Sequence, residues 1–343
     1  MKAAIKAGYD KKRNILADQI PLTAPYSIAL SSSQKCNFRC NYCTQSLSKE
    51  EKETRGYGDT LMSWELFLEI VRQLKAFEKP IKRIAFTGLG EPLANPQTPD
   101  MVKILHQEKL ASVQLDIYTN GYLLDEDMTH RLVDAGLTRL RISLQGLNSE
   151  QYRTVAGVSI DFDRLVRQIR YFYEHRKDTI LYVKIMDAQL AEGQESEFHA
   201  IFGDICDEIF VEHLALAQPA MGDYAGRTDD ARTMFGEIAK ERAVCHYPFF
   251  YMQIDAAGNV YPCPPLGLPM EFSLGNVNKE SLRNIWEGET REKLLFDLLE
   301  KSHYGVPVCN VCQNYRCFTD DADNLDDRRE EITVRLKEKR SHV

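Results

Sequence analysis

Short apolar segments alternate with longer amphipathic ones between residues 26 and 213. Runs of five to seven mostly apolar residues predict buried strands. The predicted strands are Tyr26–Ser31, Ile81–Thr87, Val113–Thr119, Leu140–Leu144, Ile180–Met186 and Glu208–His213. The intervening segments repeat apolar residues at helical spacing. The predicted helices are Ser63–Phe77, Asp100–Gln107, Asp125–Ala135, Phe162–Glu174 and Glu195–Cys206.

This series of about six β–α units predicts an α/β fold with a mostly parallel sheet and helices outside it. Ser63 stands where a helix N-cap is expected, and Gly136 follows the helix that ends at Ala135, as a C-terminal glycine often does. A partial (β/α)6 barrel and a doubly wound sheet both fit the series. Hydrophobic periodicity does not choose between them.

The pattern is weaker on either side of this region. Residues 1–25 are polar and irregular and are interpreted as an N-terminal extension. Gly, Asp, Arg and Ala dominate residues 214–242, which indicates a linker or a loop over the substrate. Within this loop, Tyr224 and Arg227 are candidate substrate contacts.

A second domain is predicted over residues 243–320. Its first part reads as a β-hairpin, with strands at 249–255 and 260–263 around a Gly-containing turn. Short helices are expected at Ser281–Glu287 and Arg291–Glu300. Residues 321–343 are strongly charged and predict an exposed helix or a frayed tail.

Composition and charge narrow the function classes. Hydrophobic residues make up 43% of the chain and charged residues 27%, which is ordinary for a globular protein and excludes general disorder. The net charge of −8 disfavours nucleic-acid binding, because that binding depends on neutralising phosphates. The chain starts without the apolar segment of a signal peptide, and its apolar stretches are too short to span a bilayer. We therefore expect a cytoplasmic protein with neither a membrane nor a nucleic-acid partner.

Nine cysteines bring in candidate metal chemistry. In a reducing compartment, clustered cysteines more often bind metal than form disulfides. Cys36, Cys40 and Cys43 follow the first predicted strand, at the strand end where parallel α/β folds place their ligand sites. Three thiolates on one short loop are typical ligands of a 4Fe–4S cluster, and they leave one iron open. The alternative, a zinc loop, needs a fourth ligand that no nearby His supplies.

With this motif in this context, the chain resembles the radical S-adenosylmethionine (SAM) superfamily. The resemblance implies a partial (β/α)6 TIM-like barrel over residues 26–213. It also implies a 4Fe–4S cluster whose open iron is chelated by SAM. The implied activity is reductive cleavage of SAM to a 5′-deoxyadenosyl radical, which abstracts a hydrogen from the substrate.

Other segments resemble the SAM-binding parts of the same family. Gly88-Leu89-Gly90-Glu91-Pro92 is similar to a Gly-Gly-Glu-Pro segment that binds the SAM amino group, with Leu89 as a departure. The aromatic residue before the last cysteine, a Thr-Asn-Gly turn and a ribose-contacting Ser-x-Gln segment also match. Lys184 is an ionisable residue in an apolar strand, and a snorkelling lysine is its simpler interpretation. The implied SAM-binding residues are Tyr42, Gly88, Gly90, Glu91, Asn120, Ser143, Gln145 and Lys184.

The second cysteine group resembles the SPASM and twitch extensions of radical SAM enzymes, which carry auxiliary 4Fe–4S clusters. The resemblance rests on the Gly258-x4-Cys263 hairpin and on the segment from Leu274-Gly275-Asn276-Val277 to Ile285-Trp286. Five cysteines are fewer than the full SPASM pattern, so one auxiliary cluster is implied, with spacing similar to the twitch-domain aminocyclitol dehydrogenases. The preferred ligands are Cys245, Cys263, Cys309 and Cys312. Cys317 is then a spare thiol or replaces one of the four, and a zinc ribbon is the alternative to a cluster.

The residues that decide the reaction are less clearly marked. Cys206 is a buried small residue or a hydrogen-atom donor to a substrate radical, and Cys317 is a second candidate donor. Glu212 and His213 close the sixth predicted strand and are candidate bases, and Arg141 is a further polar candidate.

Two substrate classes follow from the resemblance. One is a small polar molecule, such as a sugar or aminocyclitol, that is oxidised or epimerised while the auxiliary cluster conducts an electron. The other is a ribosomal peptide that is crosslinked or epimerised; few residues precede the first predicted strand, which favours the small molecule. The expected electron donor is a flavodoxin or ferredoxin. A non-enzymatic zinc-binding interaction module is the contrasting hypothesis.

Overall fold

The computed structural model describes residues 1–9, 13–56, 58–215 and 232–341. Its strands form one ten-stranded sheet in the order β1-β7-β6-β5-β4-β3-β2-β8-β9-β10. The strands are β1 Ala4–Ile5, β2 Ser27–Leu30, β3 Ile81–Phe86, β4 Ala111–Thr119, β5 Arg139–Ser143, β6 Ile180–Met186, β7 Glu208–Glu212, β8 Tyr251–Ile254, β9 Asn259–Tyr261 and β10 Gly275–Asn276.

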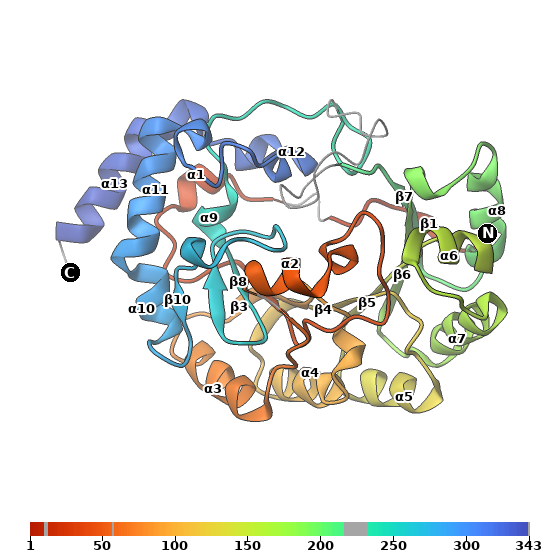
Figure 1. Cartoon of the computed structure of the whole chain (residues 1–343). Coiled ribbons are helices and arrows are strands. Elements are labelled where there is room, and N and C mark those ends of the chain that lie inside the picture. The colour runs from red at the N-terminus through yellow and green to blue at the C-terminus, as the bar shows by residue number, and fades with distance from the viewer. Residues whose placement is uncertain (10–12, 57, 216–231, 342–343) are drawn as a thin grey trace.

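The α-helices of the described residues lie between and after these strands. They are α1 Leu16–Gln19, α2 Lys49–Thr54, α3 Trp64–Leu74, α4 Thr98–Gln107, α5 Glu126–Asp134, α6 Ser149–Ala156, α7 Phe162–His175, α8 Gln194–Phe202, α9 Tyr247–Phe250, α10 Leu282–Glu287, α11 Glu289–Lys301, α12 Asn314–Cys317 and α13 Arg329–Ser341. Figure 1 shows α3, α4, α5 and α7 arranged around the outside of the curved sheet.

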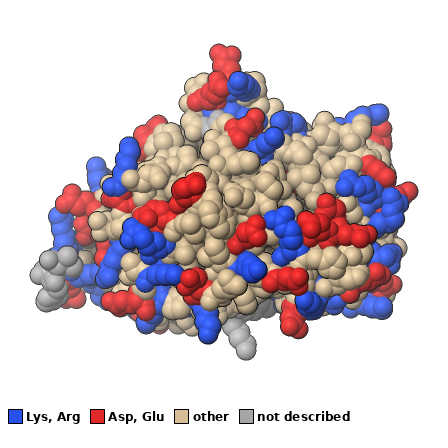
Figure 2. Space-filling view, turned by 90° about the horizontal axis from the view of Figure 1, so that it is seen from below, with Lys and Arg blue, Asp and Glu red and all other residues tan. Residues whose placement is uncertain are grey.

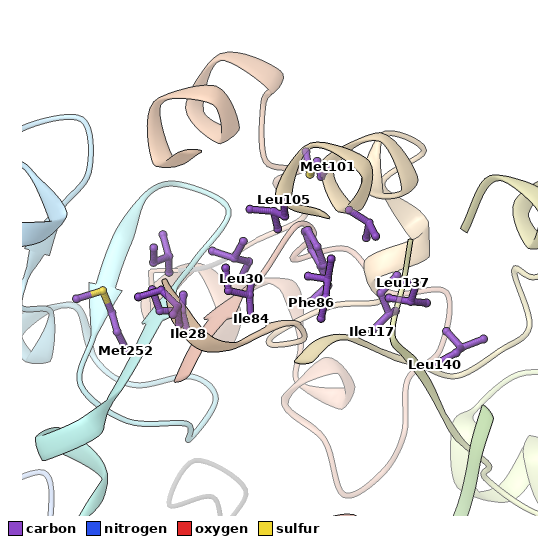
Figure 3. Close-up of a cluster of buried hydrophobic side chains, with 14 of the residues drawn as sticks. Ile28, Leu30, Ile84, Phe86, Met101, Leu105, Ile117, Leu137, Leu140 and Met252 are labelled. Atoms are coloured by element: carbon purple, nitrogen blue, oxygen red, sulfur yellow. The ribbon is translucent and has the colours of Figure 1, made fainter. Parts of the chain in front are cut away.

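The six strands β2 to β7 pair in parallel with their neighbours, which confirms the predicted α/β fold and makes it a partial barrel. Alternation along each strand separates two faces. Apolar side chains such as Ile28, Leu30 and Phe86 pack toward Met101 and Leu105 of α4 (Figure 3). The other positions hold polar side chains such as Arg83, Arg141 and Lys184, which line cavities inside the barrel, and also small apolar ones such as Ala85.

The hairpin of the C-terminal region continues the barrel sheet. β8 pairs in parallel with β2, so that Tyr251 lies beside Ser27, and β9 runs antiparallel to β8. Asp255 accepts hydrogen bonds from the backbone of Ala257 and Asn259 in the turn between them. The hairpin itself was predicted from the sequence. Its pairing with β2 was not predicted, because hydrophobic patterns do not indicate which strands pair with each other. The first cysteine loop and Cys263 of the second group consequently follow strands of the same sheet.

The ends of the chain are more ordered than their composition indicates. The prediction of an irregular N-terminal extension is wrong for β1, which pairs in parallel with β7, and for helix α1. In the charged C-terminal segment, α13 is a helix, and it buries Ile332 and Leu336. β1 has two residues and α1 has four, too few to show a periodicity that could be recognised in the sequence.

Acidic and basic side chains are interspersed over the face that α3, α4 and α5 cover, as Figure 2 shows from below. Pairs such as Arg72–Glu69 and Arg131–Asp100 account for part of this pattern. Among the described residues, the helices are all too short or too polar to cross a membrane.

Candidate functional site

The first cysteine loop follows β2 and is fixed by its neighbours. Cys43 donates its backbone N–H to the Cys40 carbonyl at 2.9 Å. The N–H groups of Arg39 and Asn41 donate to the last carbonyls of α6, so this helix, which the sequence did not reveal, holds the middle of the loop. All three cysteines are therefore presented at the carboxyl end of the barrel strands, as predicted for a ligand site.

The turn after β3 packs directly against this loop. A Cβ added to Gly90 would lie 2.4 Å from the Ser33 carbonyl oxygen and 2.5 Å from that of Lys35, so only glycine fits there. Gly88 has a φ of +133°, which also favours glycine. The Gln45 side chain donates to the Leu89 carbonyl and ties the turn to the cysteine loop.

Glu91 ends this turn and is buried. Its carboxylate accepts hydrogen bonds from the Leu93 N–H at 3.0 Å, the Thr119 hydroxyl at 2.6 Å and the Asn120 N–H at 2.8 Å. Burial nevertheless outweighs these donors and raises the pKa of Glu91 to about 7. Asn120, a second predicted SAM contact, donates to the Asn37 side chain at 2.8 Å and so joins the same loop.

Three polar side chains connect the cysteine loop with the fourth and fifth barrel strands, β5 and β6. The Tyr42 hydroxyl donates to the Gln145 side-chain oxygen, and Gln189 donates to the same oxygen at 3.2 Å. Ser143 pairs with Lys184 across β5 and β6. The predicted cofactor residues Tyr42, Ser143, Gln145 and Lys184 thus lie on adjoining elements at one end of the barrel.

A cavity of about 400 Å³ opens at this end. Tyr42 and Gly88 line it on the side of the cysteine loop, and Lys184 and Glu212 line it from the strand ends. Lys184 forms a buried ion pair with Glu212. Predicted site residues that are far apart in the sequence therefore line the same cavity.

The candidate base His213 also lines the cavity. Its Nδ1 lies 2.6 Å from Asp187 Oδ2, which fixes the orientation of the ring.

Two predicted catalytic residues lie elsewhere. Cys206 is fully buried before β7 starts, at the opposite end of the strands, and its thiol donates to the Phe202 carbonyl at 3.2 Å. Arg141 lies deeper in the barrel, where its Nε is 3.2 Å from Asp116 Oδ2. Cys206 is therefore corrected to a core residue, and Arg141 to a member of an interior ion-pair network. Tyr224 and Arg227 lie outside the described residues.

Several cavity residues were not singled out from the sequence. Arg83 and Tyr118 alternate with apolar residues on β3 and β4, and this alternation was the available signal. Tyr247, Tyr251 and Gln253 reach the cavity because the C-terminal hairpin joins the barrel sheet, which the sequence did not indicate.

Four of the five C-terminal cysteines are close neighbours. The pKa of Cys263 is raised well above its ordinary value, first by burial and then by the thiols of Cys245, Cys309 and Cys312. Cys317 instead lines the cavity, and its thiol donates to the Gln313 carbonyl at 3.9 Å. This arrangement fits the preferred ligand set, and Cys317 lies on the lining of the cavity.

The donor chemistry of both groups fits clusters. Burial raises the pKa of Cys36 and of Cys309 to about 12, so these thiols are protonated without metal and must release protons when they bind iron. Among the described residues, no three His, Cys, Asp or Glu side chains are arranged around a single ion. A cluster does not need that arrangement, because each thiolate binds a different iron.

A cysteine loop at the strand ends and a second cysteine group indicate a protein that holds iron–sulfur clusters. The family models that match the chain describe the same kind of protein. A model of the radical SAM superfamily matches residues 30–188, and a SPASM model, described as an iron-sulfur cluster-binding domain, matches residues 245–313. The chain carries a radical SAM domain over residues 30–188 and a SPASM domain over residues 245–313. These domains bind 4Fe–4S clusters, and the first also binds SAM.

Two curated relatives match only part of this chain, and a third matches most of it. A probable GTP 3′,8-cyclase of Methanococcus maripaludis is 37% identical over 133 residues, which are 38% of this chain and 41% of the relative. A GTP 3′,8-cyclase of Aliarcobacter butzleri is 33% identical, over 38% of this chain and 37% of the relative. The chain thus spans well under half of these two proteins. A tungsten-containing aldehyde ferredoxin oxidoreductase cofactor-modifying protein of Pyrococcus furiosus is 24% identical, over 82% of this chain and 86% of the relative.

Solved structures share the fold at low sequence identity. BtrN in complex with AdoMet and 2-DOIA has a TM-score of 0.54 at 19% identity, over 86% of this chain and 97% of BtrN. Native anSMEcpe with bound AdoMet has a TM-score of 0.55 at 17% identity, over 92% and 98%. Streptococcus suis SuiB bound to the precursor peptide SuiA has a TM-score of 0.52 at 16% identity, over 80% and 67%.

Proposed function

We propose that this protein is a radical SAM enzyme that oxidises or epimerises a small polar substrate, such as a sugar or aminocyclitol. The observation that carries the proposal is the cavity of about 400 Å³ that residues of the first cysteine loop and of the C-terminal region line together. It touches the SAM-loop residue Tyr42 on one side and Cys317 on the other. This volume suits a small molecule.

The bound cofactors would supply the 5′-deoxyadenosyl radical that removes a hydrogen atom and an acceptor for a second electron. The protein's own task is then to bind the substrate and to take a proton. His213, oriented by Asp187, can accept a proton at its imidazole ring. The Lys184–Glu212 pair offers a donor and an acceptor to substrate hydroxyl groups.

The position of Tyr247 supports an electron route toward the C-terminal cysteines. It lines the cavity, and its pKa is raised by burial and then by the thiols of Cys317 and Cys245. Tyr247 therefore borders the cavity and lies close to Cys245, one of the preferred auxiliary ligands. A cytoplasmic flavodoxin or ferredoxin is the proposed donor for the first cluster.

The relatives give limited support to the substrate class. Two are named for GTP, a small polar molecule, although the matches span well under half of those proteins. Evidence for a peptide substrate would replace the small-molecule proposal with peptide modification.

The first test is anaerobic reconstitution with iron and sulfide, followed by iron counting. The wild type should hold about eight irons and the Cys36→Ala/Cys40→Ala/Cys43→Ala variant about four, because one cluster is lost. Cys206→Ala is the matched control and should keep about eight, since this thiol lies in the core at the other end of the barrel. About four irons in the wild type and zinc in the C-terminal half would overturn the auxiliary cluster.

Activity is read in the same preparations. With a strong reductant and SAM, the wild type should release 5′-deoxyadenosine and the triple variant should not. Polyols, sugars and peptides are then compared for substrate-dependent acceleration and for deuterium transfer into 5′-deoxyadenosine. Acceleration by peptides alone would replace the small-molecule proposal with peptide modification.

A further inference from the structure

A second cavity, of about 530 Å³, lies at the other end of the barrel interior. Its lining includes residues at or near the starts of the strands, among them Ser27, Arg139 and Ile180. Lys6 of the N-terminal segment closes part of it, which gives that short segment a role beyond its pairing with the sheet edge.

The charges around this lower cavity do not balance. Asp116 Oδ2 accepts from two arginines, Arg83 at 3.0 Å and Arg141 at 3.2 Å. Glu208 likewise forms ion pairs with two cations, Lys6 at 2.7 Å and Arg139 at 3.3 Å. Among the residues that the structure describes, these four cations therefore share two carboxylates, which leaves two positive charges. Arg13, the fifth cation of the described lining, has its own partner in Asp323.

The excess charge is partly buried and not fully bonded. The Arg141 side chain is 4% exposed and that of Arg139 is 11% exposed. Arg139 Nε is buried without a hydrogen-bond partner among the described residues, and so are Asp116 Oδ1 and Glu208 Oε2. Arg141 also donates to the Gly8 carbonyl at 2.7 Å. Buried cations in excess of their partners are costly unless a ligand neutralises them.

The two cavities adjoin one another. Arg83, Tyr118 and Tyr251 line both. On β6, Lys184 lines the upper cavity and Ile180 the lower one. Ile180 and Lys184 are four positions apart along β6, but Arg141 lies in register with Tyr182, only two positions and about 7 Å from the level of Lys184. In the upper cavity, Lys184 and Glu212 neutralise each other, so the positive excess comes from cations that line the lower cavity, of which Arg83 also lines the upper one.

Building on the proposed function, we propose that the lower cavity binds a phosphate monoester of the substrate, while the reacting carbon lies in the upper cavity. A dianion matches the two excess charges, and guanidinium groups bind phosphate oxygens through paired N–H donors. The substrate class is then a phosphorylated sugar or a similar polar molecule long enough to span both levels.

The test measures binding to the reconstituted holoprotein by calorimetry, with ribose 5-phosphate, ribose and malonate as probes. Ribose 5-phosphate should bind saturably, more weakly at high salt, and ribose should not. Arg139→Gln should weaken the binding by about tenfold, because one of the cations is lost. Glu208→Gln should strengthen it, because a carboxylate is lost. Arg176→Gln removes an arginine paired with Asp207 outside the cavity lining and should change nothing.

The opposite signs separate binding from damage to the fold, since a structural defect would weaken binding in both variants. Weaker binding in Glu208→Gln, or an Arg139→Gln affinity equal to that of Arg176→Gln, would overturn the phosphate site. Malonate binding as tight as that of ribose 5-phosphate would also overturn it, in favour of a dicarboxylate. Reductant-dependent 5′-deoxyadenosine release without substrate tests the proposed function independently of all these outcomes.

Discussion

Glu91 illustrates how burial sets the chemistry of a single residue beside the cysteine loop. Three donors favour its charged form, yet the pKa rises to about 7 because desolvation costs more than these bonds return. The folded apo-protein therefore holds a proton that the unfolded chain releases at a lower pH. The stability from this proton is present in acid and is lost as pH rises through about 7.

This linkage predicts the effect of Glu91→Gln on the metal-free protein. Between about pH 5 and pH 8, the wild type should lose about 1–3 kcal/mol of unfolding free energy relative to the variant, whose side chain cannot ionise. Urea unfolding under reducing conditions measures the difference. The exposed Glu65→Gln should reproduce the wild-type slope. Parallel pH profiles for wild type and Glu91→Gln would show that Glu91 is ionised throughout.

At the scale of elements, the turn after β3 and the cysteine loop form one packed unit. The missing side chain at Gly90 lets the turn approach the carbonyls of Ser33 and Lys35. Glu91 completes the contact by donating its N–H to the Lys35 carbonyl at 2.9 Å. The geometry of the first cysteine group therefore depends on the missing side chain of Gly90, which the family resemblance also implies as a SAM contact.

Gly90→Ala should separate the two segments. We expect a loss of about 1–3 kcal/mol in stability, because backbone atoms have to shift, and weaker iron loading of the first cluster. Gly58→Ala is the control, since an added Cβ there meets no atom within 4 Å. Iron counting and thermal unfolding check both variants. Full loading and an unchanged midpoint in Gly90→Ala would mean that the turn does not position the loop.

At the scale of the whole molecule, the barrel and the C-terminal region are joined by more than the shared sheet. The buried side chain of Gln73 in α3 donates to the Val277 carbonyl at 3.1 Å and accepts from the Leu282 N–H at 2.7 Å. Trp286 of α10 donates to the Leu22 carbonyl at 3.1 Å. These contacts attach the C-terminal region to α3 and to the N-terminal segment, outside the shared sheet.

Gln73→Leu tests this coupling. Removing the amide leaves a buried N–H and a buried carbonyl without partners, so we expect a loss of about 1–3 kcal/mol and earlier melting of the C-terminal region. Hydrogen exchange at the backbone of residues near Leu282 gives the local readout. Gln107→Leu, at an exposed position of α4, should leave that exchange unchanged. Faster exchange throughout the chain, with no gradient, would count against a local joint.

The sequence by itself determined the class of fold, the six barrel strands and the two cysteine groups. Strand patterns and cysteine spacing are local, so physical rules that act over a few residues reveal them. It also indicated Lys184, Glu212 and His213 as candidate site residues, because they lie in or directly after recognisable strands.

Only the tertiary structure decided which residues share a space. It moved Cys206 into the core, joined the C-terminal hairpin to β2 and placed Cys317 on the cavity. It also gathered Lys6, Arg83 and Arg139 around one lower cavity. These outcomes depend on contacts between residues far apart in the chain, and such contacts are fixed by packing of the whole molecule rather than by any local pattern.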